Sequence, residues 1–422
     1  MTRYSDLIRT FGKIGLLSFG GPAAQIALMH RVLVDERKWL TEKDYLSALS
    51  FCMLLPGPEA MQLATWSGWR LRGMAGGLLA GLLFLLPGAV VVLALAATYA
   101  AYGTLPLMQA LFMGVQAAVA VIVIEALLRV GKRALRTRAA LILAALAFTA
   151  LFFLDAPFPL VILAAGLWGY ATARDAPTDL PSAPKAMHTA RTVALWTLLW
   201  LAPLGLLWLA EGGLLAEIGT FFAQLAILTF GGAYAVLAWM AQAVVNDKGW
   251  LTLRQMMDGL GLAETTPGPL ILVTEFVGYM AAHRTGGWTM GLAGAVVTLW
   301  VTFLPTFLMI FAGAPWIARI TANPRLAGAL SAIMAAVVGV IANLSLWFAA
   351  HVFFAEVTRT RFGPLHLLAP DPATLRPDLA ALALLAGWLL LRRHWSLPLV
   401  LALCAAGGLG LHLLTPDLPA AS

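Results

Sequence analysis

An all-α integral membrane protein is the fold class that the sequence predicts, built as an inverted internal repeat of two homologous halves. Three observations predict it: the scarcity of charged residues, the length of the uncharged stretches, and a set of motifs that occurs twice. Each half is expected to contain broken, re-entrant helices, and one extra span is expected to link the halves.

The composition is typical of a membrane protein. Of the 422 residues, 61% are apolar and 11% are charged, against about a quarter charged in an ordinary soluble domain. The 52 residues between Arg72 and Glu125 include no charged side chain. As a helix they would extend roughly 78 Å, enough for about two crossings of a hydrocarbon layer. Such long apolar runs also argue against an outer-membrane barrel, whose strands are short and alternate.

Charge and cysteine content exclude other classes of protein. The net charge of +7 first reflects Lys and Arg in cytoplasmic loops, so it does not require nucleic-acid binding. Cys52 and Cys404 both lie in apolar stretches, which supports neither a disulfide framework nor a thiolate metal site. We therefore expect no cofactor, no metal and no nucleic-acid partner.

Three short motifs recur without gaps at an offset of 211 residues. The pairs are Ser18-Phe19-Gly20-Gly21 with Thr229-Phe230-Gly231-Gly232, Trp39-Leu40-Thr41 with Trp250-Leu251-Thr252, and Pro56-Gly57-Pro58 with Pro267-Gly268-Pro269. Because three motifs stay in one register, the sequence predicts duplication and fusion. The expected domains are a first repeat at residues 1–175 with two broken re-entrant helices and about four spans, a linker with an extra transmembrane helix at 176–211, an inverted second repeat at 212–416, and a tail at 417–422.

The extra span and the basic loops predict how the halves are oriented. Residues 192–210 are uncharged and have no counterpart before the first copy, and a single added crossing inverts a second copy if each copy crosses an even number of times. The basic loop 129–138 is predicted to be cytoplasmic, and counting back from it places the N terminus in the cytoplasm. The basic segment 31–43 and Arg70 are then both cytoplasmic, although a single ordinary span between them would place them on opposite sides of the membrane. We therefore predict that the broken segments are re-entrant hairpins, which enter the membrane and return to the same side.

The breaks in these segments are the strongest candidates for a substrate site. Proline is favoured in the first turn of a helix, so Pro22, Pro58 and Pro269 predict the starts of half-helices. Gly20-Gly21, Gly57 and Gly268 permit the turns before them, because glycine readily takes a left-handed conformation. Such starts expose backbone N–H groups at the positive end of the helix dipole, and four of them around a pseudo-two-fold axis suit a tetrahedral oxyanion. The alternative is that the Gly-Gly and Pro-Gly-Pro sequences are only kinks or packing sites within helices. The candidate substrate-binding residues are Ser18, Gly20, Gly21, Pro22, Pro56, Gly57, Pro58, Thr229, Gly231, Gly232, Thr265, Thr266, Pro267, Gly268 and Pro269.

At these motifs the chain resembles the chromate ion transporter family in its long, two-domain form. The resemblance rests on FGKIGLLSFGGP at 11–22, PGPE at 56–59, TFGGAYAV at 229–236 and AETTPGP at 263–269. It implies a multi-pass protein of the bacterial inner membrane that exports chromate, recognises sulfate as a structural analogue and uses the proton-motive force. Some members carry His where this chain has Gln25, so no role for an imidazole at that position applies here.

Four ionisable residues in apolar surroundings are candidates for charge or proton coupling: Lys13, Glu59, Glu264 and Glu275. A lysine at the bilayer centre costs roughly 2.5 to 3.5 kcal/mol, so Lys13 is expected to face the interior or to anchor at the interface. An ionised Glu59 about 5 Å from a dianion would repel it by roughly 6 kcal/mol at an effective dielectric near 20. Proton and anion binding would then be coupled at Glu59, unless it is simply a favourable first-turn residue. The alternative role of Glu264 is to accept hydrogen bonds from the exposed backbone of the break.

Two other classes of function compete with active transport. An integral-membrane enzyme would need a nucleophile with a base, or a metal cluster, and the sequence offers neither, so no enzymatic activity is expected. A passive anion channel, or a transporter of another divalent oxyanion such as sulfate or molybdate, would share the half-helix site. The expected partners are the oxyanion, protons as the coupling ion and the lipid bilayer, with association into a homo-oligomer left open.

Overall fold

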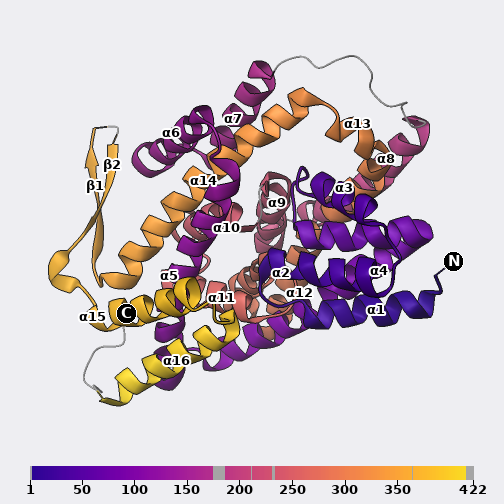
Figure 1. Cartoon of the computed structure of the whole chain (residues 1–422). Helices are drawn as coiled ribbons and strands as arrows, with labels where there is room; N and C mark the ends of the chain where they lie inside the picture. The colour runs from indigo at the N-terminus through magenta and orange to yellow at the C-terminus, as the bar shows by residue number, and fades with distance from the viewer. Residues whose placement is uncertain (1, 174–185, 211, 231–232, 364, 415–422) are drawn as a thin grey trace. The chain divides into compact units, whose positions relative to one another are not determined.

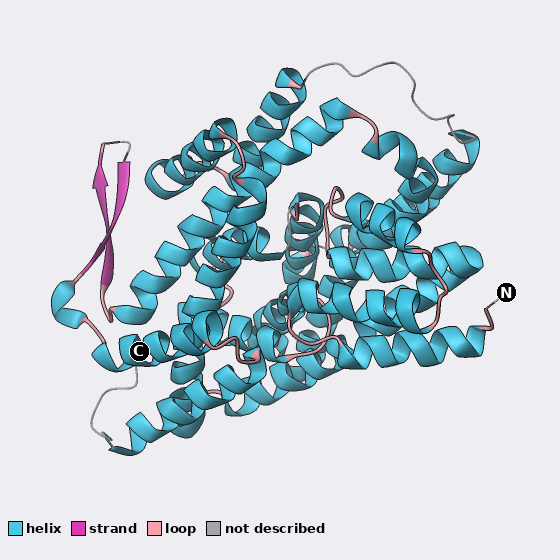
Figure 2. Ribbon diagram, viewed as in Figure 1, coloured by secondary structure: helices cyan, strands magenta, loops and turns pink. Residues whose placement is uncertain are grey.

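The computed structural model describes residues 2–173, 186–210, 212–230, 233–363 and 365–414. Helices make up most of this part of the chain, and the named strands form a single hairpin (Figure 2). The predicted tail at 417–422 and residues 176–185 of the predicted linker lie outside the described residues.

The helical elements follow one another with short connections. The α-helices are α1 (Tyr4–Leu17), α2 (Gly21–His30), α3 (Glu42–Cys52), α4 (Glu59–Tyr102), α5 (Pro106–Ala134), α6 (Arg138–Leu154), α7 (Phe158–Thr172), α8 (Ala186–Leu209), α9 (Gly213–Leu228), α10 (Ala233–Gln242), α11 (Leu253–Thr265), α12 (Val273–Gly313), α13 (Ile317–Thr321), α14 (Pro324–Phe353), α15 (Pro377–Gly387) and α16 (Leu397–Leu414). The π-helical segments are η1 (Arg31–Glu36), η2 (Ala243–Asp247) and η6 (Trp388–Arg392), and the 3-10 turns are η3 (Leu270–Leu272), η4 (Ala314–Trp316) and η5 (Pro372–Thr374). The strands are β1 (Val357–Phe362) and β2 (Leu365–Pro370).

Six helical stretches in the described part of the chain are long and apolar enough to cross a membrane. They are Glu59–Tyr102, Pro106–Ala134, Thr189–Leu209, Leu270–Ile320, Pro324–Phe353 and Leu397–Leu414. Three shorter apolar helices, α6, α7 and α9, accompany them. The predicted all-α membrane fold is therefore confirmed, and α8 lies where the extra span was expected.

The β1–β2 hairpin was not predicted. Its strands pair antiparallel from Val357 with Pro370 to Phe362 with Leu365, and Gly363 takes a left-handed conformation with φ of 58° at the turn. The alternation of β-branched residues with arginine in β1 is a recognisable strand signal. The hairpin was missed because it lies between two apolar helices, α14 and α15, whose longer pattern was the stronger feature of this part of the sequence.

The first of two compact units combines Met1–Ala97, Thr172–Val236 and Thr266–Gly328. Within this unit α12 packs against α8 and α9, and α3 packs against α13. Two tryptophan side chains form hydrogen bonds between α8 and α12. Trp200 Nε1 donates to the Val301 carbonyl at 2.9 Å. Trp300 Nε1 donates to the Leu199 carbonyl at 3.1 Å. The extra span is therefore fixed to the long helix of the predicted second repeat.

The second unit combines Thr98–Ala171, Leu237–Thr265 and Ala329–Ser422. Within it α5 packs against α11, α15 and α16, of which the last two are coloured yellow in Figure 1. Strand β2 packs against α6. Both predicted repeats therefore contribute segments to both units.

Local backbone features recur at matching positions in the two repeats. Segments η1 and η2 are both π-helical, and each is followed by a left-handed residue, Lys38 and Gly249. The bond from the Trp39 N–H to the Leu33 carbonyl has its counterpart from Trp250 to Val244. Arg37 lies over the Trp39 ring as Lys248 lies over Trp250, with the cation 5.8 Å from the ring centroid in both cases.

The long helices α4 and α12 break in the same way. Arg72 and Gly73 have φ/ψ of −145°/25° and 64°/−159°, and Gly286 and Gly287 have −142°/21° and 65°/−155°. Each helix then continues through an internal proline, Pro87 or Pro305. The similarity of the two halves therefore extends well beyond the three motifs read from the sequence.

Candidate functional site

The first break separates α1 from α2. Helix α1 ends at Leu17, Gly20 takes a left-handed conformation with φ of 86°, and α2 begins at Gly21 with Pro22 in its first turn. This is the half-helix start that the Gly-Gly-Pro sequence predicts. Of its counterpart in the second repeat, Gly231 and Gly232 lie outside the described residues.

The Pro-Gly-Pro breaks also have the expected left-handed glycines. Gly57 has φ of 117° and Gly268 has φ of 92°. Helix α4 begins at Glu59, directly after Pro58, whereas Pro269 leads into the 3-10 turn η3 and α12 begins only at Val273. The second Pro-Gly-Pro motif is therefore not directly followed by an α-helix, which differs from the prediction.

Two hydrogen bonds join the breaks crosswise between the repeats. The Gly57 N–H donates to the Thr229 carbonyl at 2.7 Å, and the Gly268 N–H donates to the Ser18 carbonyl at 2.9 Å. Gly57 and Gly268 occupy matching positions in the repeat, and so do Ser18 and Thr229. All four residues belong to the first unit, so within this unit each bond joins a break of one repeat to a break of the other.

The Gly268 break is closed. Gln25 Nε2 donates to the Gly268 carbonyl at 2.7 Å and to the Ser18 carbonyl at 3.2 Å. A Cβ atom on Gly268 would lie 3.0 Å from Leu272 Cδ1 and 3.5 Å from Gly88 Cα. Residues 266–270 are all buried. Apolar neighbours and an amide that is already bonded therefore occupy this side.

The Gly57 break has polar neighbours instead. A Cβ atom on Gly57 would lie 2.8 Å from Gln62 Nε2 and 3.6 Å from Thr306 Oγ1. Gln62 Nε2 donates to the Pro56 carbonyl at 2.7 Å, and Gln62 Oε1 is buried without a hydrogen-bond partner. Pro56, Pro58 and Glu59 are only partly buried. The two Pro-Gly-Pro breaks thus differ in both chemistry and accessibility.

The hydroxyl groups beside the breaks donate back to their own helices. Ser18 Oγ donates to the Ile14 carbonyl at 2.6 Å, Thr229 Oγ1 to Leu225 at 2.7 Å, and Thr265 Oγ1 to Leu262 at 2.7 Å. This is the common role of helical Ser and Thr. The protons of these three hydroxyls are therefore in use and are not free to bind an anion at the breaks.

The four ionisable candidates differ in their surroundings. Lys13 is exposed on α1, beside the exposed Leu16 and Leu17, as an interfacial anchor would be. Glu59 is half-buried at the start of α4, and Glu264 is buried near the end of α11. Glu275 is 1% exposed in the first turn of α12, and neither of its carboxyl oxygens has a hydrogen-bond partner.

Sequence analysis missed a buried polar cluster in the second unit. The Asp258 carboxylate, on α11, accepts a hydrogen bond from the Tyr99 hydroxyl at 2.6 Å and one from Gln116 Nε2 at 2.7 Å. Asp258 is 1% exposed. It lies between two repeat motifs but in neither of them, so only its charge could have identified it from the sequence. Gln62 and Thr306 were missed because they also lie outside the motifs.

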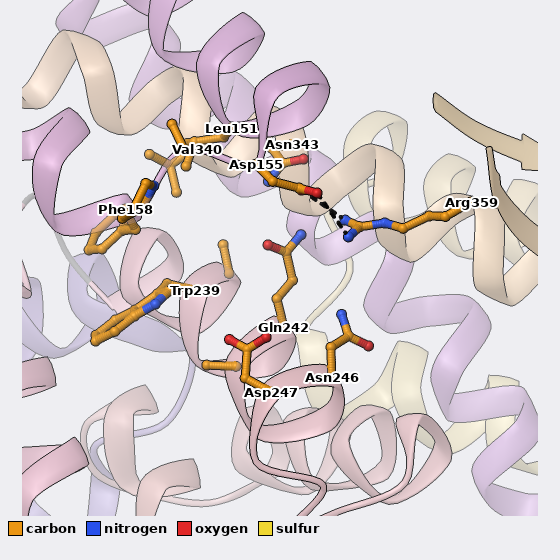
Figure 3. A pocket seen from close by; sticks show the side chains of 14 residues that line it. Leu151, Asp155, Phe158, Trp239, Gln242, Asn246, Asp247, Val340, Asn343 and Arg359 are labelled. Carbon is orange, nitrogen blue, oxygen red and sulfur yellow. Dashed lines mark hydrogen bonds and ion pairs between the residues drawn. The ribbon is translucent and has the colours of Figure 1, made fainter. Parts of the chain in front are cut away.

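A polar cavity of about 240 Å³ also lies in the second unit (Figure 3). Asp155, at the turn after α6, meets Arg359 of β1 at 3.4 Å and His366 of β2 at 3.2 Å. Asn246 and Asp247, the last two residues of η2, line the same cavity. The turn after α6 and the loop after α10 therefore lie at the same end of this unit.

A surface pocket gives the corresponding observation for the first unit. Thr2, Trp39 and Arg70 line it together, and Arg72 Nε donates to the Thr2 carbonyl at 2.6 Å. The chain start, the loop after η1 and the kink of α4 therefore lie at one end of this unit. The re-entrant hairpins between these points stay a prediction.

No group of three or more His, Cys, Asp or Glu residues that could hold a metal ion occurs in the described part of the chain. Cys52 and Cys404 are both free and buried there.

Comparison with known proteins gives the family. A family model described as chromate transporter matches residues 5–170 and 216–411. The chain is 34% identical to a chromate transport protein of Pseudomonas aeruginosa over 85% of this chain and 82% of that protein. It is 32% identical to a chromate transport protein of Cupriavidus metallidurans over 80% of both chains, and 32% identical to a probable chromate transport protein of Synechococcus elongatus over 80% of this chain and 82% of that one.

No solved structure matches the chain. The two matched segments fall within the two halves that the repeated motifs predicted. This multi-pass membrane protein belongs to the chromate transporter family.

Proposed function

We propose that this protein exports chromate across the bacterial plasma membrane, with the oxyanion bound at the helix breaks of the first unit. The observation that carries the proposal is the crosswise pair of bonds, Gly57 to Thr229 and Gly268 to Ser18. These bonds bring breaks from both halves together in one unit, where the positive ends of helix dipoles and first-turn N–H groups can stabilise an anion. Transport of sulfate or molybdate is the alternative, because backbone donors recognise charge and shape.

The start of α4 is the part of the site best suited to an anion. Gln62 N–H makes the first helical bond of α4, to the Pro58 carbonyl at 2.9 Å, so the first-turn N–H groups lie ahead of it. Helix α4 follows its glycine break directly and is partly accessible there. The Gly268 break is buried and leads into a short 3-10 turn. We therefore assign the principal anion contact to the first repeat.

Two carboxyl groups are proposed to couple the anion to protons. Glu59 begins α4, and an ionised carboxylate about 5 Å from a dianion would oppose binding by roughly 6 kcal/mol at an effective dielectric near 20. Glu275 is buried without a hydrogen-bond partner, and an ionised carboxylate in such surroundings costs several kcal/mol. Glu275 therefore carries a proton in this conformation and releases it when water or a cation reaches it.

The two repeats are proposed to have opposite orientations, with the N terminus in the cytoplasm. The grouping of Thr2, Trp39 and Arg70 at one pocket supports re-entrant hairpins that open to the basic, cytoplasmic side. The grouping of Asp155 with Asn246 supports an outward loop in the second repeat. Under this arrangement the extra span α8 provides the odd crossing that inverts the second copy.

Flux measurements in proteoliposomes test the proposal. Labelled chromate or sulfate is loaded inside, and release is followed with a pH gradient of either sign or with none. A coupled transporter changes its rate with the sign of the gradient, whereas a passive channel follows the anion gradient and the membrane potential alone. Absence of chromate flux under every gradient would overturn the proposed substrate, and sulfate flux without chromate flux would favour the alternative.

A further inference from the structure

We propose that Gln62 makes the site selective for a singly protonated oxyanion, such as hydrogen chromate, over a fully ionised one. The inference rests on the proposed function, because it concerns the protonation state of the anion bound at that site. It identifies a specificity-determining residue and a reason why chromate and sulfate would be treated differently.

Chemistry fixes the orientation of the Gln62 amide. Nε2 lies 2.7 Å from the Pro56 carbonyl oxygen, and a carbonyl oxygen can only accept a hydrogen bond. The NH2 group therefore faces Pro56, and Oε1 is the atom left for another partner. Gln62 is fully buried, and Oε1 has no hydrogen-bond partner in the described part of the chain.

The buried Oε1 of Gln62 needs a hydrogen-bond donor. Leaving such an oxygen without a donor is unfavourable, and native proteins rarely do so. Gln62 lies in the first turns of α4, beside the Gly57 break. The start of a helix offers N–H groups that have no partner within the helix. The ligand that satisfies both features has one O–H group and several acceptor oxygens.

Hydrogen chromate has that pattern, and fully ionised chromate or sulfate does not. A fully ionised tetrahedral oxyanion has only acceptor oxygens, so one of them would meet Oε1 with no proton between them. The protonated form donates its O–H to Oε1 while its other oxygens accept from the α4 N–H groups. Sulfate loses its second proton at far lower pH than chromate, so near neutral pH chromate alone supplies the protonated form in quantity.

Charge favours the same species. Glu59 is the first residue of α4, and its repulsion of a monoanion is half its repulsion of a dianion at equal distance. An anion that brings its own proton also moves one proton with each transport step. Proton coupling then resides partly in the substrate itself.

The second repeat does not contain a matching acceptor. The position matching Gln62 is Val273, and the Gly268 break faces Leu272 and Gly88. Thr306, which faces Gly57, corresponds in turn to Gly88, because each directly follows the internal proline of its helix. The acceptor is therefore specific to the Gly57 side.

A pH dependence of KM that comes from protein groups must be distinguished from one that comes from protonation of the substrate. Glu59 lies at the start of α4, Cys52 at the end of α3 interacts electrostatically with it, and Glu275 lies at the start of α12. Thr306 of α12, which faces Gly57, does not titrate. The pH profile is therefore measured in the wild type and in Glu59→Gln, Cys52→Ala and Glu275→Gln backgrounds.

The experiment measures KM for total labelled chromate in proteoliposomes at pH values on both sides of the second pKa of chromate. If only the protonated form binds, KM in the wild type rises about tenfold per pH unit above that pKa, since the competent fraction falls by that factor. The same rise is expected in the three background variants. Sulfate is expected to be a weak competitor throughout.

Variants at Gln62 then test the residue itself. Gln62→Leu is expected to raise KM about tenfold at the acidic end, as loss of one hydrogen bond predicts. It is also expected to flatten the rise of KM with pH and to strengthen competition by sulfate. Gln62→His, with one ring nitrogen for Pro56 and one as acceptor, is expected to restore the slope. Gln224→Leu, an exposed position on α9, serves as the matched control and keeps the wild-type profile.

A KM that stays flat across the pKa of chromate in the wild type overturns the inference without any variant. An unchanged slope and unchanged sulfate competition in folded Gln62→Leu overturns it as well. In both cases the proposed function survives, because chromate is still transported. If Gln62→Leu fails to fold, the wild-type slope and the Gln62→His variant still decide the question.

Discussion

The N–H of Gly57 and the carbonyl oxygen of Thr229 are 2.7 Å apart, and this hydrogen bond joins residues from opposite halves of the chain. Its counterpart joins Gly268 to Ser18. Each left-handed glycine therefore has two roles, since it turns its own segment and donates to the other repeat. Each bond therefore couples the backbone of one break to the end of a helix in the other repeat.

Gly57→Ala is expected to abolish transport. At φ of 117° an alanine is strained by roughly 1–3 kcal/mol, and its Cβ would press on Gln62 Nε2 at 2.8 Å. The relevant measurements are chromate flux and the melting temperature in detergent. Gly12→Ala in α1 is the control, because its Cβ would meet no atom within 4 Å and alanine favours a helix by about 1 kcal/mol. Equal flux from both variants would show that the break geometry is dispensable.

Gln25→Leu is expected to destabilise the Gly268 break. The substitution removes the hydrogen bonds from Nε2 to the Gly268 and Ser18 carbonyls, and leaving buried acceptors with fewer donors costs roughly 1–3 kcal/mol. Thermal unfolding in detergent measures the loss, with the exposed Gln224→Leu as control. A melting temperature equal to that of the control would mean that Gln25 does not hold this break closed.

The orientation of the repeats can be tested with cysteines at matching exposed positions. With Cys52 and Cys404 replaced, Glu36→Cys and Asp247→Cys place single thiols on η1 and η2, where both native residues are exposed. A membrane-impermeant maleimide is expected to label Glu36→Cys only from the cytoplasmic side and Asp247→Cys only from outside. Labelling of both from one side would refute inversion.

The fold was predictable wherever a feature depended on local chemistry. Uncharged length predicted the membrane helices, and the Gly-Gly-Pro and Pro-Gly-Pro sequences predicted left-handed turns before half-helices, as found at Gly20 and Gly57. The π-helical segments η1 and η2 were not predicted, because a π-helix depends on how one extra residue is accommodated by its neighbours. Periodicity alone does not reveal it.

The positions of the helix breaks were predictable, and their surroundings were less so. The sequence identified matching breaks, but the surroundings of each break depend on residues distant in the chain, such as Gly88 beside Gly268 and Thr306 beside Gly57. Gln62 and Asp258 lie outside the motifs, and only their burial shows that their polar groups matter. A single sequence does not reveal such long-range pairing.

Glu59→Gln tests the coupling role proposed for the start of α4. A neutral amide there removes the repulsion of the bound anion, so chromate affinity is expected to rise and driving by a pH gradient to weaken. Flux is compared with and without a gradient in wild type and variant. Glu36→Gln, an exposed residue of η1, is the control. Gradient-driven flux of wild-type size in Glu59→Gln would exclude this carboxyl as a coupling group.

The Asp258 cluster is expected to fix α11 in the second unit. Asp258 accepts hydrogen bonds from Tyr99 at 2.6 Å and Gln116 at 2.7 Å, and removing one partner of a buried carboxylate leaves its charge less compensated. Tyr99→Phe and Gln116→Leu should each lower stability, and the double variant should show a coupling of roughly 0.5–3 kcal/mol because both share one partner. Thermal unfolding of all four proteins, wild type included, measures the coupling. Strictly additive losses would mean that the two donors act independently and that the shared carboxylate does not hold α11 in place.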